Sequence, residues 1–396
     1  MDALNVLTII LFAAIGLMSV QLTFLLVEIL CAVKKDRGQE DVPAEAAHPS
    51  VAVLVPAHNE EKVLVHALKA IFAQLQPSDR LVVIADNCTD STPNLARQMG
   101  ARVIERHDLQ RVGKGYAVDA GARYLEASPP DVVVVIDADC VPQEGAISHL
   151  ARLAQTYRTP VQAAYLMTAP NGSRAETQLR EVMVLLRNLV RPLGLHRLRL
   201  PCLLTGSGMA FPWRIFRDAP LASGNRVDDM QLAVDLAISG ALPRFCPAAR
   251  VTNVLPAETN ASRVQSSGWM EGHLRTLLTQ VPRLLASALR QGNFKLAVLA
   301  LELSVPPLSM LMLGWALLSI MALSIFYAGG SHWPLWAVLY NGAVLVASGA
   351  VFWAKFGRER VPAKALLAMP LLFRHSISAA FSAAFTRPKP WIRTSR

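Results

Sequence analysis

Apolar residues gather toward the two ends of the chain rather than in its middle. Residues Leu4–Val33 are almost continuously apolar and long enough to cross a hydrocarbon core of about 30 Å. The run lacks the basic start, short apolar core and small-residue cleavage site of a signal peptide, which favours a retained anchor. Further apolar stretches cover Leu296–Tyr327 and Leu335–Ala354, and Pro306 and Pro307 are expected to kink or break the first of these. The pattern predicts three membrane spans.

Between the apolar ends, short β-branched runs alternate with segments whose apolar residues recur at helical spacing. The run Val132–Ile136 is typical of a strand buried on both faces. Strands that alternate with helices predict an α/β domain built on a parallel sheet with right-handed crossovers. The predicted strands are Val51–Val55, Arg80–Ala85, Arg102–Glu105, Val132–Ile136, Pro160–Thr168, a glycine-interrupted Leu204–Phe211 and Pro243–Pro247, and the predicted helices are Lys62–Leu75, Thr92–Met99, Gly115–Leu125, Glu176–Leu195 and Asp229–Ser239.

The remaining segments are assigned from amphipathicity and charge. After Ser262 the chain is basic, amphipathic and helical to about Gln291, as expected for helices on a membrane surface. The last apolar stretch, Val361–Phe385, contains basic residues and a proline and precedes a basic tail, so it is expected to lie on the membrane or re-enter it. We therefore predict an anchor (1–33), an α/β domain (50–260), interfacial helices (261–292), two spans (296–354) and an interfacial or re-entrant helix with a basic tail (361–396).

Composition agrees with a membrane protein whose central domain lies in the cytosol. Hydrophobic residues make up 53% of the chain, and the mean hydropathy of +0.33 is high for a soluble protein. Lys34, Lys35 and Arg37 follow the first apolar segment, and positive charge beside a span marks its cytoplasmic side. The net charge of +10 suits anionic headgroups or anionic substrates, whereas no nucleic-acid recognition motif accompanies it. The five cysteines lack the paired spacing of a zinc site or disulfide framework, and nothing in the sequence specifies an oligomeric state.

Polar side chains follow three predicted strands at the point where each ends. Glu60 follows the first strand, Asp86 the second, and Asp137 and Asp139 the run Val132–Ile136. Because side chains alternate along an extended segment, Asp137 and Asp139 point to the same side. Ligands of an open α/β sheet bind at the carboxyl ends of its strands. Two carboxylates at such an end suit a divalent cation that holds a diphosphate, although polar residues that merely end a strand would look the same.

Two nucleotide-binding classes are disfavoured. Neither G-x-G-x-x-G nor G-x-x-x-x-G-K-[ST] follows the first predicted strand. The first motif would indicate a dinucleotide-dependent dehydrogenase and the second an NTPase. The sequence argues against both.

Six motifs occur in order over about residues 50–275: V-A-V-L-V-P-A-H-N-E-E, V-V-I-A-D-N-C-T-D-S-T, G-K-G-Y-A-V-D-A-G, V-V-I-D-A-D, G-S-G-M-A-F and V-D-D-M-Q-L. Together they resemble the motifs of family-2 glycosyltransferases, which have the GT-A fold. The flanking spans resemble those of the membrane-integrated branch that builds bacterial surface polysaccharides. The resemblance implies a GT-A domain with a parallel-rich sheet, a nucleotide-sugar donor, and a multi-pass protein of the bacterial inner membrane with a cytoplasmic catalytic domain.

The resemblance also implies roles for residues that bind the donor. Asp86 would hydrogen-bond the nucleobase, which is uracil in the commonest donors. Asp137 would contact the ribose or donor sugar, and Asp139, with Asp137 beside it, would ligate Mg²⁺ or Mn²⁺. A hard cation is needed because the leaving group is a nucleoside diphosphate. The other implied donor-binding residues are Pro56, Ala57, Glu60 and Lys114, the last of which is otherwise an ordinary solvated lysine at a helix start.

The two acids of V-D-D look like the part of the family that removes the acceptor proton. Asp229 would be the catalytic base of an inverting displacement, since it takes the proton of the acceptor hydroxyl as that oxygen attacks the anomeric carbon. Asp228 fills the slot where the family commonly has glutamate, and we expect it to cap the helix. Capping by both acids, with no catalytic role, is the alternative.

Residues of the acceptor side depart from the family pattern. Gly206, Gln265 and Trp269 are the implied acceptor-binding residues, and an interfacial anchor is the alternative for Trp269. Processive members have Q-x-x-R-W, whereas this chain has Gly268 in place of the arginine. Glycine cannot make the bidentate phosphate contact of an arginine. This favours transfer of one sugar to a lipid-linked or other glycan acceptor at the bilayer.

Two alternatives to that function remain. One is a processive synthase that polymerises and extrudes a β-linked glycan. The other is a transporter or membrane scaffold, which would place ionisable residues within the spans. Glu28 and Glu302 are nearly alone there, and a scaffold leaves the ordered aspartates unexplained.

Overall fold

The computed structural model describes residues 3–34, 47–170, 172–223, 228–255, 260–366 and 377, and only the backbone of 260–271. Its strands form one eight-stranded sheet of order β3-β2-β1-β4-β7-β6-β8-β5. The strands are β1 (Val51–Ala57), β2 (Arg80–Asp86), β3 (Arg102–Arg106), β4 (Val132–Val135), β5 (Val141–Pro142), β6 (Val161–Thr168), β7 (Met209–Pro212) and β8 (Arg244–Val254). The helices are α1 (Ala3–Val33), α2 (Leu64–Phe72), α3 (Thr92–Gln98), α4 (Lys114–Leu125), α5 (Ala146–Tyr157), α6 (Ala175–Leu185), α7 (Arg191–Arg197), α8 (Trp213–Arg217), α9 (Asp228–Ile238), α10 (Asn260–Gln291), α11 (Phe294–Ser304), α12 (Leu308–Tyr327), α13 (Trp333–Phe352) and α14 (Ala363–Leu366), with π-helical turns η1 (Leu186–Val190) and η2 (Trp353–Gly357).

The first half of the sheet is parallel, as the strand and helix alternation predicts. β1 pairs in parallel with β2 and with β4, and β3 extends the same parallel run beyond β2. β7 then joins antiparallel to β4 and to β6, while β6 and β8 are parallel to each other. The sheet is therefore mixed but rich in parallel pairs, and the carboxyl ends of β1, β2 and β4 share one edge.

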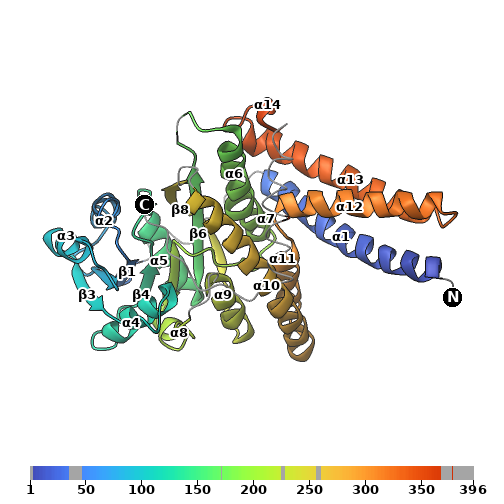
Figure 1. The fold of residues 1–396 in the computed structure, drawn as a ribbon. Helices are drawn as coiled ribbons and strands as arrows, with labels where there is room; N and C mark the ends of the chain where they lie inside the picture. Colours follow the sequence, from blue (N-terminus) through green and yellow to red (C-terminus); the bar gives the residue numbers. More distant parts are fainter. Residues whose placement is uncertain are drawn as a thin grey trace.

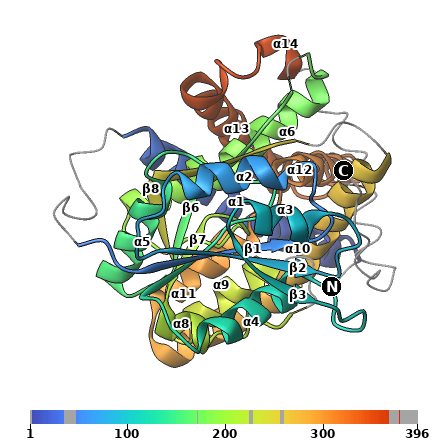
Figure 2. The same ribbon diagram turned by 90° about the vertical axis from the view of Figure 1, so that its left-hand side faces the viewer.

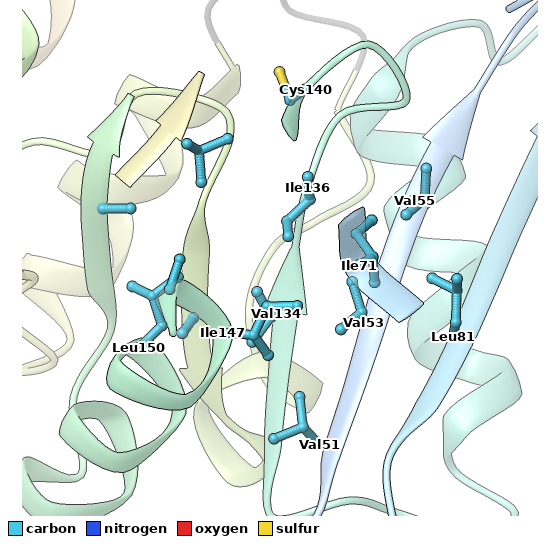
Figure 3. Packing of buried hydrophobic residues seen from close by; sticks show 14 of the residues in the cluster. Val51, Val53, Val55, Ile71, Leu81, Val134, Ile136, Cys140, Ile147 and Leu150 are labelled. Carbon is cyan, nitrogen blue, oxygen red and sulfur yellow. The ribbon is translucent and has the colours of Figure 1, made fainter. Parts of the chain in front are cut away.

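Helices cover both faces of this sheet and leave its central strands without solvent contact. Val51, Val53 and Val55 of β1 belong to a hydrophobic cluster with residues of α2 and α5 on one face of the sheet, and Figure 3 shows Ile71 beside β1 and Ile147 beside Val134. The alternate residues Ala52 and Leu54 pack on the other face with α4, α9 and α11. Figure 2 shows α2 and α3 on one side of the sheet and α4 and α8 on the other. Burial on both faces explains why β1 and β4 are continuous apolar runs.

One strand is longer than the sequence indicates. The predicted strand covered Pro243–Pro247. In the structure β8 continues to Val254, with a register shift in which Ala163 pairs with Cys246 and the next residue, Ala164, with Arg250. The shift is a bulge that places Pro247 outside the regular ladder.

The apolar segment predicted from Leu296 divides at Pro306 and Pro307. Before the prolines, α11 buries Leu296, Leu299 and Leu303 in the core of the α/β domain. After them, α12 begins at Leu308. The apolar residues of α11 thus serve the domain core, and the second candidate span starts later than the predicted boundary at 296.

Three helices are long and apolar enough to cross a membrane, judged by length and composition among the described residues: Leu4–Val33, Leu308–Tyr327 and Trp333–Gly357. Figure 1 shows α1, α12 and α13 projecting together from one end of the α/β domain. Ser19 Oγ donates to Asn341 Oδ1 at 2.8 Å, and Trp315 Nε1 donates to the Val338 carbonyl at 2.8 Å. Such contacts hold apolar helices together without a hydrophobic driving force between them. Most of the predicted linker (38–49) and of the segment 361–385 lies outside the described residues.

Close backbone packing joins α1 to the domain. A Cβ atom built on Gly194 of α7 would lie 2.1 Å from the Glu28 carbonyl oxygen, so only glycine permits this approach. Arg197 donates to the carbonyls of Cys31 and Ala32, which satisfies the C-terminal end of α1. Helix α1 is therefore fixed to the α/β domain rather than tethered loosely.

Replacing Gly194 with alanine is expected to destabilise this junction by about 1–3 kcal/mol, the usual cost of overpacking. The clash is with backbone atoms of Glu28, which have no rotamer to adopt. Unfolding temperature in detergent measures the effect. Gly16→Ala in α1 is the control, because its added methyl would meet nothing within 4 Å. Equal unfolding temperatures for the two variants would contradict the close packing.

Candidate active site

The loops that carry the predicted acids meet at the edge where β4 ends. Val135 of β4 pairs antiparallel with Met209 of β7, so residues just before Met209 lie at that edge. The amide of Gly208 donates to the Val135 carbonyl at 3.0 Å, and the amide of Asp137 donates to Ser207 Oγ at 3.1 Å. Because β7 pairs antiparallel with β4, the bend at Gly206–Gly208 just before β7 lies beside Asp137.

Lys114 joins three of the predicted segments. Its Nζ contacts both Asp137 Oδ1 and the carbonyl oxygen of Gly206. Burial disfavours the charged amine, but the carboxylates of Asp137 and Asp228 hold the pKa of Lys114 above its ordinary value. Lys114 is therefore an ion-paired cation within the site, and the alternative of a solvated lysine is wrong.

The glycine after Lys114 explains part of the G-K-G motif. A Cβ atom on Gly115 would lie 2.5 Å from the Leu221 carbonyl oxygen and 2.7 Å from that of Ser223. The start of α4 therefore packs directly on the backbone just before α9. A small pocket at this contact is lined by Lys114, Gly115, Val118, Met209, Pro220, Leu221, Ser223, Asp228, Asp229 and Leu232.

Asp137 and Asp139 lie together, as their spacing predicts. One ligand atom from each, and the Cys140 thiol, all lie within 4.8 Å of one another. Burial and repulsion from Asp139 raise the pKa of Asp137, while Lys114 opposes this. Burial and both carboxylates raise the pKa of the Cys140 thiol well above its usual value. The hard carboxylate oxygens thus fit Mg²⁺ or Mn²⁺, whereas Cys140 is a protonated, buried thiol that belongs to the core.

Asp228 and Asp229 open α9 beside this group. The amide of Asp229 donates to Asp228 Oδ1 at 3.0 Å, and the amide of Met230 donates to Asp229 Oδ1 at 2.9 Å. Burial and repulsion from Asp229 raise the pKa of Asp228 to about 6. Burial also raises the pKa of Asp229, against the opposing charges of Arg187 and Lys114. Asp229 Oδ2 faces Gly206, since a Cβ atom there would lie 3.3 Å from it.

The first two strand-end loops are tied to each other. The amide of Thr89 donates to Asn59 Oδ1 at 2.8 Å, and the amide of Glu60 donates to Thr92 Oγ1 at 2.8 Å. His58 Nδ1 donates to the Asp86 carbonyl at 2.6 Å. Pro56 and Ala57 end β1, so the predicted nucleotide-binding residues of both loops lie on neighbouring parallel strands.

Two residues of the site region were missed by sequence reasoning. Arg106, at the end of β3, donates from Nη1 to Asp86 Oδ1 at 2.6 Å and from Nη2 to the Arg111 carbonyl at 2.6 Å. Gln162 of β6 is buried and donates to the Ser207 carbonyl at 2.9 Å, while its Oε1 accepts from the Thr205 amide at 2.8 Å. Neither lies in a motif, and only strand pairing brings them to the site.

Not every predicted residue joins this cluster. The side chains of Gln265 and Trp269 lie outside the described part of the chain. A separate hollow of about 570 Å³ is lined by Arg214, Asp235 and Arg283 among others, and none of the predicted acids lines it. Within the described residues, the acids and Lys114 define the better candidate for an active site.

The sequence is similar to those of known glycosyltransferases. A family model described as "Glycosyltransferase like family 2" matches residues 48–272, more than half of the chain. The chain is 36% identical over 110 residues to "Probable glycosyltransferase YdaM" of Bacillus subtilis (strain 168), which covers 26% of each protein. It is 35% identical over 94 residues to a 4,4'-diaponeurosporenoate glycosyltransferase of Staphylococcus haemolyticus (strain JCSC1435), covering 23% of this chain and 24% of that one. The chain thus spans about a quarter of the length of these curated relatives.

A solved structure resembles nearly the whole chain. It is the mannosyltransferase PcManGT from Pyrobaculum calidifontis, in complex with GDP-Man and Mn²⁺. The TM-score is 0.58 at 19% sequence identity, and the match covers 96% of this chain and 99% of the other. At this identity the likeness concerns the fold, which is a GT-A-like α/β fold in both.

Proposed function

The chain belongs to glycosyltransferase family 2, and from this premise we propose that it transfers a sugar from a nucleotide-diphospho-sugar to a membrane-associated acceptor with inversion at the anomeric carbon. The observation that carries the proposal is the grouping of Asp137, Lys114 and Asp229 where β4, α4 and α9 meet. A metal-binding pair of acids on one side and a buried base on the other suit an in-line displacement.

The donor half of the proposed site is built on the first four strands. Asp139, with Asp137, would hold Mg²⁺ or Mn²⁺, and the cation would stabilise the charge of the departing nucleoside diphosphate. Lys114 adds a further positive charge next to Asp137. Asp86, fixed in orientation by Arg106, is proposed to accept a hydrogen bond from the nucleobase. Pro56, Ala57 and Glu60 are proposed to line the nucleotide from the neighbouring strand.

Asp229 is proposed as the general base of the acceptor half. Its Oδ1 is engaged by the Met230 amide, so Oδ2, which faces Gly206, is the oxygen that takes the acceptor proton. Asp228 holds the Asp229 amide and so orders the start of α9. Gly206 leaves room beside Oδ2, which supports its proposed place next to the acceptor, together with Gln265 and Trp269.

The site is proposed to work at the cytoplasmic face of a bacterial inner membrane, with segments 1–33 and 296–354 containing the spans and 50–260 the catalytic domain. Leu278 and Leu289 of α10 are 68% and 86% exposed, and Leu285 lies on the same helical face. Figure 1 shows α11 leading up to the base of the three apolar helices, with α10 packed beside it. This exposed apolar face supports an interfacial position for 261–292, and 361–396 is proposed to lie at the same surface.

Surface polysaccharide synthesis by single-sugar transfer is the proposed role. The absence of an arginine at Gly268 favours it over processive polymerisation. The length of the product made by purified protein distinguishes the two.

Nucleotide-sugar turnover tests the proposed function. Detergent-solubilised protein is expected to release nucleoside diphosphate from at least one member of a panel of UDP-hexoses and GDP-mannose when Mn²⁺ or Mg²⁺ is present. Excess EDTA should abolish the release, and added Mn²⁺ should restore it, because the leaving group needs the cation. Folded protein that neither binds nor cleaves any member of the panel would contradict the proposal.

A further inference from the structure

A π-helical turn interrupts the helix that packs against α1. The sequence pattern predicts one continuous amphipathic helix over Glu176–Leu195, whereas the structure has α6, η1 and α7 in succession. Single π turns are rare, and they often occur at functional sites. This one carries Arg187, which is partly buried, and the buried Arg191 follows it directly, so two guanidinium groups leave the same turn.

Arg191 is used for structure. Its Nε donates to Glu28 Oε2 of α1 at 2.8 Å, and its Nη2 donates to Glu302 Oε2 of α11 at 2.5 Å and to the Glu302 carbonyl at 3.0 Å. All three side chains are buried. Arg191 therefore joins the anchor helix to the domain and has two acidic partners of its own.

Arg187 faces the active site instead. Its Nη2 lies 3.9 Å from Met230 Sδ, at the first turn of α9. The amide of that same Met230 donates to Asp229 Oδ1 at 2.9 Å. Burial and the like charge of Arg191 lower the pKa of Arg187 to about 10, so the guanidinium is still cationic at neutral pH.

The other charged groups around Asp229 do not by themselves stabilise a negative charge on its carboxylate. Asp228 on the same helix and Asp137 after β4 repel a charge on Asp229. Lys114 attracts it but also contacts Asp137. Burial, together with the charges of Arg187 and Arg191, lowers the pKa of His273 of α10 to about 3, so it is neutral. Burial raises the pKa of Asp229, and the charge of Arg187 is the largest effect that opposes this rise.

We propose that Arg187 is a positioning residue whose guanidinium keeps the Asp229 carboxylate in the charged form that a general base requires. The inference rests on the proposed function, because it assigns a purpose to Asp229 as base. The π turn is what allows the two arginines to diverge, Arg191 toward the membrane helix and Arg187 toward α9. The π turn therefore places Arg191 where it holds α1 to the domain and Arg187 where it stabilises the charged form of Asp229.

The pH profile of sugar transfer tests the proposal. The rate requires ionised Asp229, so it falls as pH drops through the pKa of that group. Arg187→Gln removes the opposing charge and should move the acid limb of kcat upward by about one pH unit, whereas Arg187→Lys should move it by much less. Arg180→Gln is the matched control, since Arg180 on α6 pairs with Glu176. An unchanged acid limb in Arg187→Gln would overturn the proposal.

A second measurement does not depend on activity. Unfolding temperatures of Arg187→Gln, Asp229→Asn and the double variant form a double-mutant cycle. Each single change leaves one buried charge without its partner, so the double variant should lose less stability than the sum of the two. If the losses of stability were strictly additive while the unaltered protein transferred sugar, only the pairing of Arg187 with Asp229 would be overturned. If the two substitutions were coupled in stability but the unaltered protein transferred no sugar, the pairing of Arg187 with Asp229 would stand and the assignment of Asp229 as base would be overturned.

Discussion

Asp229→Asn is expected to lower kcat by about 10²–10⁴-fold, the range that a positioned general base contributes. Asparagine keeps the shape of the side chain and can still accept from the Met230 amide, so α9 should begin as before. What is lost is the ability of Oδ2 to take a proton. Nucleotide-sugar affinity should change little, because the change lies on the acceptor side. Transfer kinetics at saturating donor, with donor binding measured separately, distinguish the two effects.

The control for this variant lies on the same helix. Asp235 of α9 pairs with Arg283 away from the acid cluster, so Asp235→Asn should retain the wild-type rate. Asp228→Asn separates the two acids that open α9. A variant at Asp228 that loses the rate while Asp229→Asn keeps it would move the base to Asp228, whose pKa is raised to about 6.

Asp139→Asn is expected to lower the rate by about 10³-fold or more, since metal stabilisation of a leaving group is worth several kcal/mol. An amide oxygen is a weaker ligand than a carboxylate for a hard cation. Affinity for Mn²⁺, measured by calorimetry or by the electron paramagnetic resonance signal of unbound Mn²⁺, should fall in parallel with activity. Excess Mn²⁺ should rescue part of the loss.

An exposed acid in the same loop provides the comparison. Glu144 follows Asp139 closely in the chain but points to solvent. Glu144→Gln should therefore change neither Mn²⁺ affinity nor rate. If Asp139→Asn bound Mn²⁺ as the unaltered protein does, the proposed metal site would have to be abandoned.

Strands β1 to β4 and β6 were predictable from the sequence. A strand buried on both faces must be apolar at consecutive positions, and Val132–Val135 satisfies this so fully that the element was evident before its partners were known. The adjacent Asp137 and Asp139 follow from the alternation of side chains. The three apolar helices were predictable for a similar reason, since length and hydropathy are local properties.

Sequence patterns indicate that a side chain is buried but not what buries it. The location of α11 and the length of β8 could not be predicted for this reason. The apolar spacing of α11 fits a membrane span as well as a core helix, and only its packing against the sheet assigns it to the core. Pro247 ends a regular strand, yet a bulge carries β8 past it. Pairing with β6 outweighs the local effect of the proline.

The sequence by itself determined strands β1 to β4 and β6, the three long apolar helices and the acids at the strand ends, because each depends on neighbours within a few residues. Only the tertiary structure decided which charges meet. Lys114 is separated from Asp137 by 23 residues and from Gly206 by 92, and Arg191 from Glu28 by 163. No spacing rule reaches across such distances. The direction of Arg187 toward Asp229 further depends on one π turn, which leaves no periodic mark in the sequence.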